Sequence, residues 1–205
     1  MPKFLKGYKG RPVILVDMDG VIASYDQGII DQLTNRYPDI PILKTRKNWY
    51  ISDDYPEHSR LLRDLYDEPG FFENLPLIDH ALEGWQRLID LGYHPVICSA
   101  PQQSNPRCKI EKLNWLKREF VPEFGELIVD QAIIDKNKHL HGSFAIIEDN
   151  PKVPNADLAL WKQILFNQPY NQNSQIELRM YGWLDKKLPE LLTKIADISS
   201  MSQMY

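Results

Sequence analysis

The segment Pro12-Val13-Ile14-Leu15-Val16-Asp17-Met18-Asp19-Gly20-Val21 decides the fold of this chain. Its first part is a continuous apolar run rich in β-branched residues, which is typical of a strand buried on both faces of a parallel sheet. The run ends in two carboxylates separated by one residue, and Gly20 then permits a sharp backbone turn. We therefore expect a buried strand that delivers Asp17 and Asp19 to one edge of a sheet.

Similar apolar runs recur at residues 93–99, 143–149 and 161–166, with a shorter candidate strand at 127–129. Helical periodicity lies between and after them, at 79–91, 109–120 and 184–198. In the 109–120 helix, the pattern predicts one face formed by Ile110, Leu113, Leu116 and Lys117. Strands that alternate with helices predict an α/β fold, a doubly wound, Rossmann-like parallel sheet with right-handed crossovers.

Residues 24–75 break this alternation, because they are too long for one crossover helix. They contain two helical candidates, 29–37 and 58–66, on either side of an aromatic, polar segment. We expect a core domain made of residues 1–23 and 76–205, and a small, mainly α-helical cap formed by 24–75 and inserted after the first strand.

Composition narrows the classes of protein that the chain could represent. A net charge of −4 over 205 residues, with no basic face, argues against binding a nucleic acid polymer. Two cysteines make no disulfide framework, so a reducing compartment is expected. Neither an apolar leader nor a stretch of membrane-spanning length is visible. These features predict a cytoplasmic protein that does not contact membranes, and they leave open whether it is a monomer or a homodimer.

The strands of the predicted sheet end in polar side chains. In open parallel sheets ligands bind at the carboxyl ends of the strands, and three of the runs end in Asp17, Ser99 and Asp149. Two carboxylates at one edge favour a bound cation, and Mg²⁺ prefers oxygen ligands. A hydroxyl there can donate to a phosphoryl oxygen. The simpler alternatives are a turn-capping aspartate and, for Ser99, a helix N-cap.

Charged residues near the 143–149 run extend this predicted site. Lys136 and Lys138 precede the run, and one of them is expected to neutralise a phosphoryl group, although position alone does not choose between them. Glu148 could orient a water molecule or a lysine next to Asp149.

The polar residues at the strand ends match the motifs of a known superfamily. Asp17-Met18-Asp19-Gly20-Val21 resembles the first motif of the haloacid dehalogenase (HAD) superfamily. Ser99, a downstream lysine and Glu148-Asp149 resemble its second, third and fourth motifs in order. More narrowly, residues 13–151 are similar to the 5'(3')-deoxyribonucleotidase family, and the tail resembles its bacterial and phage-type members. The fourth motif is commonly Asp-Asp, so Glu148 departs from the family while the metal-binding Asp149 is kept.

The resemblance implies further site residues. The family's third-motif lysine stands eleven residues before the metal-binding aspartate, which selects Lys138 over Lys136. The nucleobase is expected to contact cap aromatics and their neighbours: Tyr25, Trp49, Tyr50, Ile51, and Phe71 or Phe72. A stretch containing Glu111, Lys112 and Trp115 also matches the family. The loop at Tyr170 and Asn171 follows the last strand, and it could either approach the site or be an ordinary loop.

The resemblance implies a Mg²⁺-dependent phosphatase that acts on (deoxy)ribonucleoside monophosphates through an aspartyl phosphate on Asp17. Asp19 would act as general acid and base, and its backbone carbonyl would join Asp17 and Asp149 in holding the metal. Ser99 and Lys138 would bind the phosphoryl oxygens. The alternatives are a phosphatase for another small phosphometabolite and a phospho-acceptor or binding module without turnover. The aromatic cap favours the nucleotide.

Overall fold

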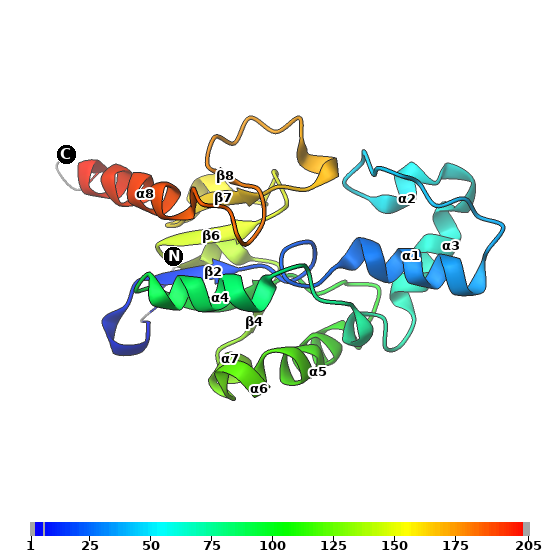
Figure 1. The fold of residues 1–205 in the computed structure, drawn as a ribbon, viewed down its shortest axis with the longest axis horizontal. Helices are drawn as coiled ribbons and strands as arrows, with labels where there is room; N and C mark the ends of the chain where they lie inside the picture. Colours follow the sequence, from blue (N-terminus) through cyan, green and yellow to red (C-terminus); the bar gives the residue numbers. More distant parts are fainter. Residues whose placement is uncertain (1–2, 6, 203–205) are drawn as a thin grey trace.

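The computed structural model describes residues 3–5 and 7–202 (Figure 1). Within them, a six-stranded parallel sheet has the order β4-β3-β2-β6-β7-β8, and β1 pairs with β5 in a separate parallel ladder. The strands are β1 (Lys3–Phe4), β2 (Val13–Val16), β3 (His94–Ser99), β4 (Ile133–Ile134), β5 (His141–Gly142), β6 (Ala145–Glu148), β7 (Lys162–Phe166) and β8 (Arg179–Met180). This arrangement confirms the predicted α/β fold.

Helices connect and cover the strands. The α-helices are α1 (Tyr25–Arg36), α2 (Ile51–Asp54), α3 (Ser59–Asp67), α4 (Ala81–Asp90), α5 (Cys108–Glu119), α6 (Val121–Phe124), α7 (Leu127–Asp130) and α8 (Leu188–Ser202). The 3-10 helices are η1 (Tyr8–Gly10), η2 (Pro56–His58), η3 (Phe72–Asn74), η4 (Lys138–Leu140), η5 (Ala156–Leu158) and η6 (Pro169–Asn171). None of the helices in the described part of the chain combines the length and apolar character needed to cross a bilayer.

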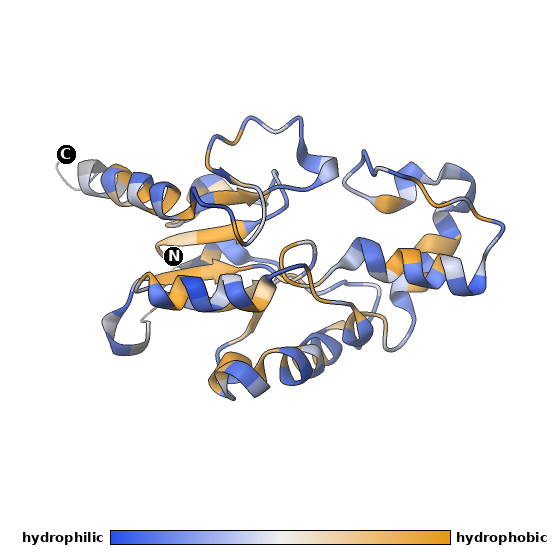
Figure 2. Ribbon diagram, viewed as in Figure 1, coloured by the Kyte–Doolittle hydropathy of each residue, from blue (hydrophilic) through white to orange (hydrophobic). Residues whose placement is uncertain are grey.

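Strand β2 lies in the middle of the sheet and is buried on both faces. Val13 and Leu15 pack into one hydrophobic cluster, whereas Ile14 and Val16 pack into the other, as the two-residue period of a strand requires. Figure 2 shows the same apolar character along β2 and β6. The parallel register pairs Val16 with Ile97 of β3 and Ile147 of β6, so these three strands end at nearly the same level.

Helices α1, α2 and α3 lie together at one end of the molecule, beyond the point where β2 ends and opposite α8 (Figure 1). α1 packs against α3, and α2 packs against the same helix. This group of helices lies within residues 25–67 and is located beyond the carboxyl end of β2.

The short run at 127–129 is a helix, α7, and not the strand expected from sequence. The strand at this edge is β4, which pairs with the end of β3 through Ile133 and Ile134. Three apolar residues fit either period, so the run carries no decisive signal. The two-residue strands β4 and β8 are likewise too short to produce an alternating pattern.

The buried face of α5 also differs from the prediction. Ile110 is 50% exposed, and Lys117 lies in solvent. The buried positions are Cys108, Glu111, Lys112, Trp115 and Leu116. Their spacing is a regular helical stripe, but two of its members are charged, which hides the stripe from a search for apolar residues.

Gly84 in α4 allows Trp183 to pack closely against the helix, and Trp183 in turn holds the loop after β2. An added Cβ would lie 2.2 Å from the ring of Trp183, which is buried and donates its indole N–H to the carbonyl of Val21 at 2.8 Å. The indole is therefore held on two sides and cannot move away at little cost.

We expect Gly84→Ala to destabilise the protein by about 1–2 kcal/mol. Overpacking costs about 1–3 kcal/mol, which exceeds the gain of up to about 1 kcal/mol from replacing a mid-helix glycine by alanine. Urea denaturation provides the measurement, and Gln86→Ala on the exposed face of α4 is the control. A Gly84→Ala protein as stable as the wild type would contradict the contact.

Candidate active site

The loop after β2 fixes the first two acids. The carbonyl of Met18 accepts hydrogen bonds from the backbone N–H groups of Val21, Ile22 and Ala23 at 3.1, 2.8 and 2.8 Å. Gly20 has a φ of +74°, a conformation that residues with a side chain rarely adopt. The chain therefore turns back directly after Asp19, and both acids are left at the carboxyl edge of the sheet.

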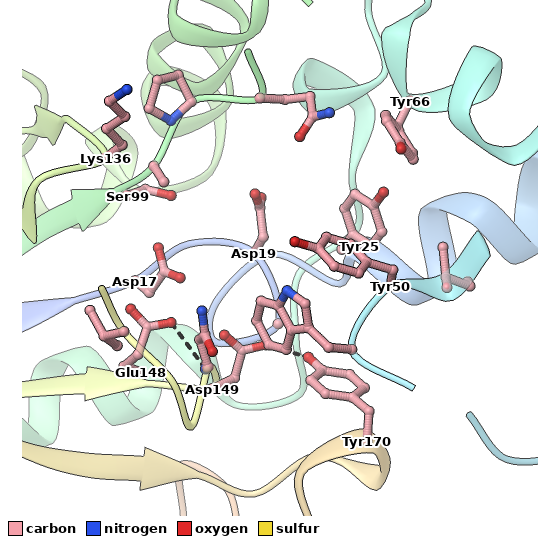
Figure 3. Close-up of a pocket in the computed structure, with 18 of the residues that line it drawn as sticks. Asp17, Asp19, Tyr25, Tyr50, Tyr66, Ser99, Lys136, Glu148, Asp149 and Tyr170 are labelled. Carbon is pink, nitrogen blue, oxygen red and sulfur yellow. Dashed lines mark hydrogen bonds between the residues drawn. The ribbon is translucent and has the colours of Figure 1, made fainter. Parts of the chain in front are cut away.

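Three neighbouring strands bring their end residues to the same place. Ser99 ends β3 and Glu148 ends β6, with Asp149 directly after it, and Figure 3 shows these side chains around Asp17. The carboxylates of Asp17, Glu148 and Asp149 each offer an oxygen within 4.8 Å of the others, and all three residues are buried. Such a concentration of negative charge requires nearby positive charge.

Lys138 supplies part of that charge from η4. Its Nζ lies 2.9 Å from Oδ1 of Asp17 and donates to Oε2 of Glu148 at 2.5 Å. Burial would lower the pKa of Lys138, but the carboxylates of Asp17 and Glu148 outweigh it and raise that pKa. Lys138 therefore stays protonated. Lys136, the other candidate, is exposed at the rim of the cavity.

The pKa values of the three acids are shifted in different directions. Burial acts to raise the pKa of Asp17, but Lys138 and Lys112 outweigh it and the pKa is lowered. Burial, together with the negative charge of Asp17, raises the pKa of Glu148 well above its usual range and that of Asp149 to about 7. Asp17 is thus the acid that is held most firmly as a carboxylate.

The residues present fit a divalent cation. Oδ1 of Asp149 is buried and, within residues 3–5 and 7–202, has no hydrogen-bond partner; Oδ1 of Asp17 has only its ion pair with Lys138. Both oxygens of Glu148 accept hydrogen bonds, Oε2 from Lys138 at 2.5 Å and Oε1 from the backbone N–H of Asn150 at 3.1 Å, so Asp17 and Asp149 are better placed to bind a metal. Buried oxygen ligands of this kind suit Mg²⁺.

Lys112 of α5 occupies the opposite side of the site. Its buried Nζ donates to Oδ2 of Asp19 at 2.6 Å, to Oγ of Ser99 at 2.8 Å and to the carbonyl of Ala100 at 3.0 Å. All three donor hydrogens are therefore used. Burial raises the pKa of Asp19; Lys112 counteracts it, and the net shift is upward.

A cavity of about 330 Å³ lies over these groups. Asp17, Asp19, Ser99 and Lys138 line its floor, and aromatic rings from α1, α3 and the segment before α2 form another wall (Figure 3). The aromatic lining residues are Tyr25, Trp49, Tyr50, Tyr66, Phe72 and Tyr170. One cavity thus joins a charged end to an aromatic end.

The structure brings most of the residues selected from sequence to this cavity. Tyr25, Trp49, Tyr50 and Ile51 line it, and Tyr50 is 65% exposed, whereas Ile51 is buried. Phe71 does not line the cavity, because it is buried with its edge against the ring of Tyr25. Its neighbour Phe72, the other candidate, takes the position on the wall.

Sequence reasoning did not select Lys112 for the site. The available signal was the match of Glu111, Lys112 and Trp115 to a stretch of the resembled family, which gave Lys112 no role. A second omission is Arg46, which pairs with Asp26 and lies 4.1 Å above the ring of Tyr170. The loop at Tyr170, left open from sequence, reaches the site, since the tyrosine hydroxyl donates to Oδ2 of Asp149.

Two solved structures share the fold of this chain. A Bacillus subtilis protein with the provisional name HAD-hydrolase, solved with bound magnesium, matches with a TM-score of 0.55 at 14% identity, over 89% of this chain and 98% of its own. A haloacid dehalogenase-like hydrolase of Streptococcus pneumoniae matches with a TM-score of 0.51 at 13% identity, over 90% and 98%. The fold is therefore that of the HAD hydrolases.

Sequence comparison identifies a family of nucleotidases to which the chain is similar. A family profile described as "5' nucleotidase, deoxy (Pyrimidine), cytosolic type C protein" matches residues 11–195. A Bordetella bronchiseptica protein with the provisional name 5'(3')-deoxyribonucleotidase is 34% identical, over 78% of this chain and 86% of its own. The human mitochondrial 5'(3')-deoxyribonucleotidase is 28% identical over 84% and 78%.

The chain belongs to this deoxyribonucleotidase family of the HAD hydrolases. The expected family and the expected class of enzyme, a phosphoric monoester hydrolase of the 5'-nucleotidase type, are both confirmed.

We expect Lys112→Met to lower the free energy of unfolding by about 1–3 kcal/mol, because methionine keeps the apolar stem but leaves the Asp19 carboxylate without its partner. Urea denaturation at neutral pH measures the change. Lys117→Met, an exposed position on the same helix, is the matched control and should have little effect. Equal stabilities for the two variants would show that Lys112 does not stabilise the Asp19 carboxylate.

Proposed function

We propose that this chain is a Mg²⁺-dependent phosphatase that hydrolyses (deoxy)ribonucleoside monophosphates through an aspartyl phosphate on Asp17. One observation carries the proposal: a buried carboxylate of lowered pKa lies at the charged end of a cavity whose other end is aromatic. A nucleoside monophosphate matches this cavity, because it has an anionic phosphate at one end and a flat base at the other.

Asp17 is proposed as the nucleophile. Its carboxylate oxygen attacks phosphorus, and the bond from phosphorus to the nucleoside oxygen breaks. The lowered pKa keeps Asp17 deprotonated and available for attack. Lys138, already 2.9 Å from Asp17, and Ser99, at the end of the adjacent strand, are suited to bind the phosphoryl oxygens.

Asp19 is proposed as the acid and then the base. Its raised pKa supports a protonated form that gives its proton to the departing nucleoside oxygen. In the second step Asp19 takes a proton from water, the water oxygen attacks phosphorus, and the bond to Asp17 breaks to release phosphate. Lys112 holds the Asp19 side chain in place through both steps.

The proposed metal ligands are Asp17, Asp149 and the backbone carbonyl of Asp19. Mg²⁺ held there supplies charge neutralisation between the Asp17 carboxylate and the substrate phosphate, two anions that otherwise repel. Glu148, tied to Lys138 at 2.5 Å, is proposed to keep that lysine oriented and not to bind the metal.

Residues 24–75 are proposed as a cap on a core of 1–23 and 76–205. Tyr25, Trp49 and Tyr50 are the proposed base-contacting residues, with Ile51 behind them and Phe72 on the wall where Phe71 was the other candidate. Stacking suits a nucleotide, because every base has a π-face. The cytoplasmic location and the monomeric or homodimeric state stay predictions.

We expect Asp17→Asn to abolish phosphate release while leaving the fold intact, because the amide is nearly the same shape but cannot act as the nucleophile. Phosphate release from a nucleoside monophosphate with Mg²⁺ present measures the effect, and circular dichroism checks the fold. Asp39→Asn, an exposed position, is the matched control and should keep wild-type turnover. Full activity in Asp17→Asn would rule out the proposed nucleophile.

A panel of phosphate esters tests the substrate class. We expect Mg²⁺-dependent turnover of nucleoside monophosphates with kcat/KM values clearly above those for sugar phosphates, because the latter have no aromatic base to stack on the aromatic wall. Turnover of sugar phosphates alone would favour the alternative of a phosphatase for another small metabolite. Phosphate transfer to the protein without release would favour the phospho-acceptor module.

A further inference from the structure

We propose that Tyr170 restricts Asp149 to a single metal-binding oxygen and thereby makes the site select Mg²⁺ over Ca²⁺. The inference rests on the metal site in the proposed function, and it adds a residue that controls which cation the site accepts. It follows from three observations: the hydrogen bond of the tyrosine hydroxyl, the packing that holds the ring, and the absence of a side chain at Gly20.

The hydroxyl of Tyr170 donates to Oδ2 of Asp149 (Figure 3). The other carboxylate oxygen, Oδ1, is buried and has no hydrogen-bond partner within the part of the chain that the structure describes. The two oxygens of one carboxylate are therefore in different situations. Oδ1 is available to a cation, and Oδ2 is occupied by a proton donor.

Hydrogen bonds from the neighbours of Tyr170 fix the loop that carries the tyrosine. Asn171 donates to the carbonyl of Asp149 and to that of Phe166, both at 2.8 Å, and Gln168 donates to the carbonyl of Gly20 at 2.6 Å. The loop η6 is thus tied to the backbone of the residue that Tyr170 contacts, and the hydroxyl cannot withdraw without breaking these bonds.

The ring of Tyr170 is also held by contacts with Trp49 and Arg46. Trp49 meets it edge-on, with ring centroids 5.4 Å apart, and the guanidinium of Arg46 lies 4.1 Å from its centroid. Arg46 is itself paired with Asp26 of α1 and donates to the carbonyl of Trp49. Residues far apart in sequence therefore enclose one tyrosine.

Gly20 leaves the space that the hydrogen bond needs. A Cβ at this position would lie 2.2 Å from Oδ2 of Asp149 and 2.6 Å from the hydroxyl oxygen of Tyr170. Any other residue would push the two groups apart, and the φ of +74° disfavours one in any case. The backbone is therefore shaped around the pair formed by the hydroxyl and the carboxylate.

This arrangement distinguishes cations by how they use a carboxylate. Ca²⁺ takes 6–8 oxygens at about 2.3–2.6 Å and often binds both oxygens of one carboxylate. Mg²⁺ demands octahedral geometry at about 2.0–2.1 Å and is satisfied by one oxygen of each carboxylate, with water completing its shell. Binding of a cation by both oxygens of Asp149 would break the hydrogen bond from Tyr170 and leave its hydroxyl without this charged acceptor. This cost applies to Ca²⁺ and not to Mg²⁺.

The test compares the Mg²⁺ and Ca²⁺ dissociation constants of the full-length chain by titration calorimetry without nucleotide. We expect the wild type to bind Mg²⁺ more tightly, and Tyr170→Phe to reduce the ratio of the Ca²⁺ to the Mg²⁺ dissociation constant by about tenfold, the size of one hydrogen bond to a charged group. Tyr181→Phe, at a tyrosine that is 66% exposed, is the matched control and should leave the ratio unchanged.

A crystal structure of Tyr170→Phe with Ca²⁺ should show both oxygens of Asp149 on the metal. A wild type without preference for Mg²⁺ would overturn the inference even if the variant does not fold. An unchanged ratio in Tyr170→Phe, or equal weakening of both cations, would also overturn it. Loss of preference in the variant supports the inference even if no nucleotide is hydrolysed, whereas an unchanged ratio in an active nucleotidase refutes only the inference.

Discussion

Asp17, Glu148 and Asp149 lie buried within 4.8 Å of one another, and the repulsion among them is the constraint on which the site depends. A buried ion costs several kcal/mol unless it is paired. A parallel sheet creates this situation, because it delivers the ends of adjacent buried strands to one place. Lys138 and Lys112, both buried, offset part of the charge, and what is left over is the electrostatic basis for a bound cation.

The two lysines contact different acids, and burial acts on these acids as well. Lys138 sits between Asp17 and Glu148, whereas Lys112 sits between Asp19 and Ser99. At Asp17, Lys138 and Lys112 outweigh burial and keep the carboxylate ionised, whereas at Asp19 burial outweighs Lys112 and raises the pKa. Two aspartates only two positions apart in sequence thus acquire the opposite properties that a nucleophile and an acid require.

The fold and the charged floor of the site could be predicted because strand ends converge. Once the apolar runs are assigned to a parallel sheet, Asp17, Ser99 and Asp149 must meet at its carboxyl edge. Lys112 could not be found in this way, since it enters from the side of a helix and breaks the apolar stripe by which that helix face would be recognised. Tyr170 lies in a loop after β7, and the path of such a loop depends on tertiary contacts rather than on local pattern.

The turn that carries Asp19 and Gly20 depends on residues made much later by the ribosome. The carbonyl of Val21 is bonded by Trp183, 162 positions downstream, and the carbonyl of Gly20 by Gln168, 148 positions downstream. At about 5–20 residues per second, these partners are synthesised roughly 8–30 seconds after the turn itself. In the nascent chain, Asp19 and Gly20 are therefore present for this interval before the contacts that hold their turn can form.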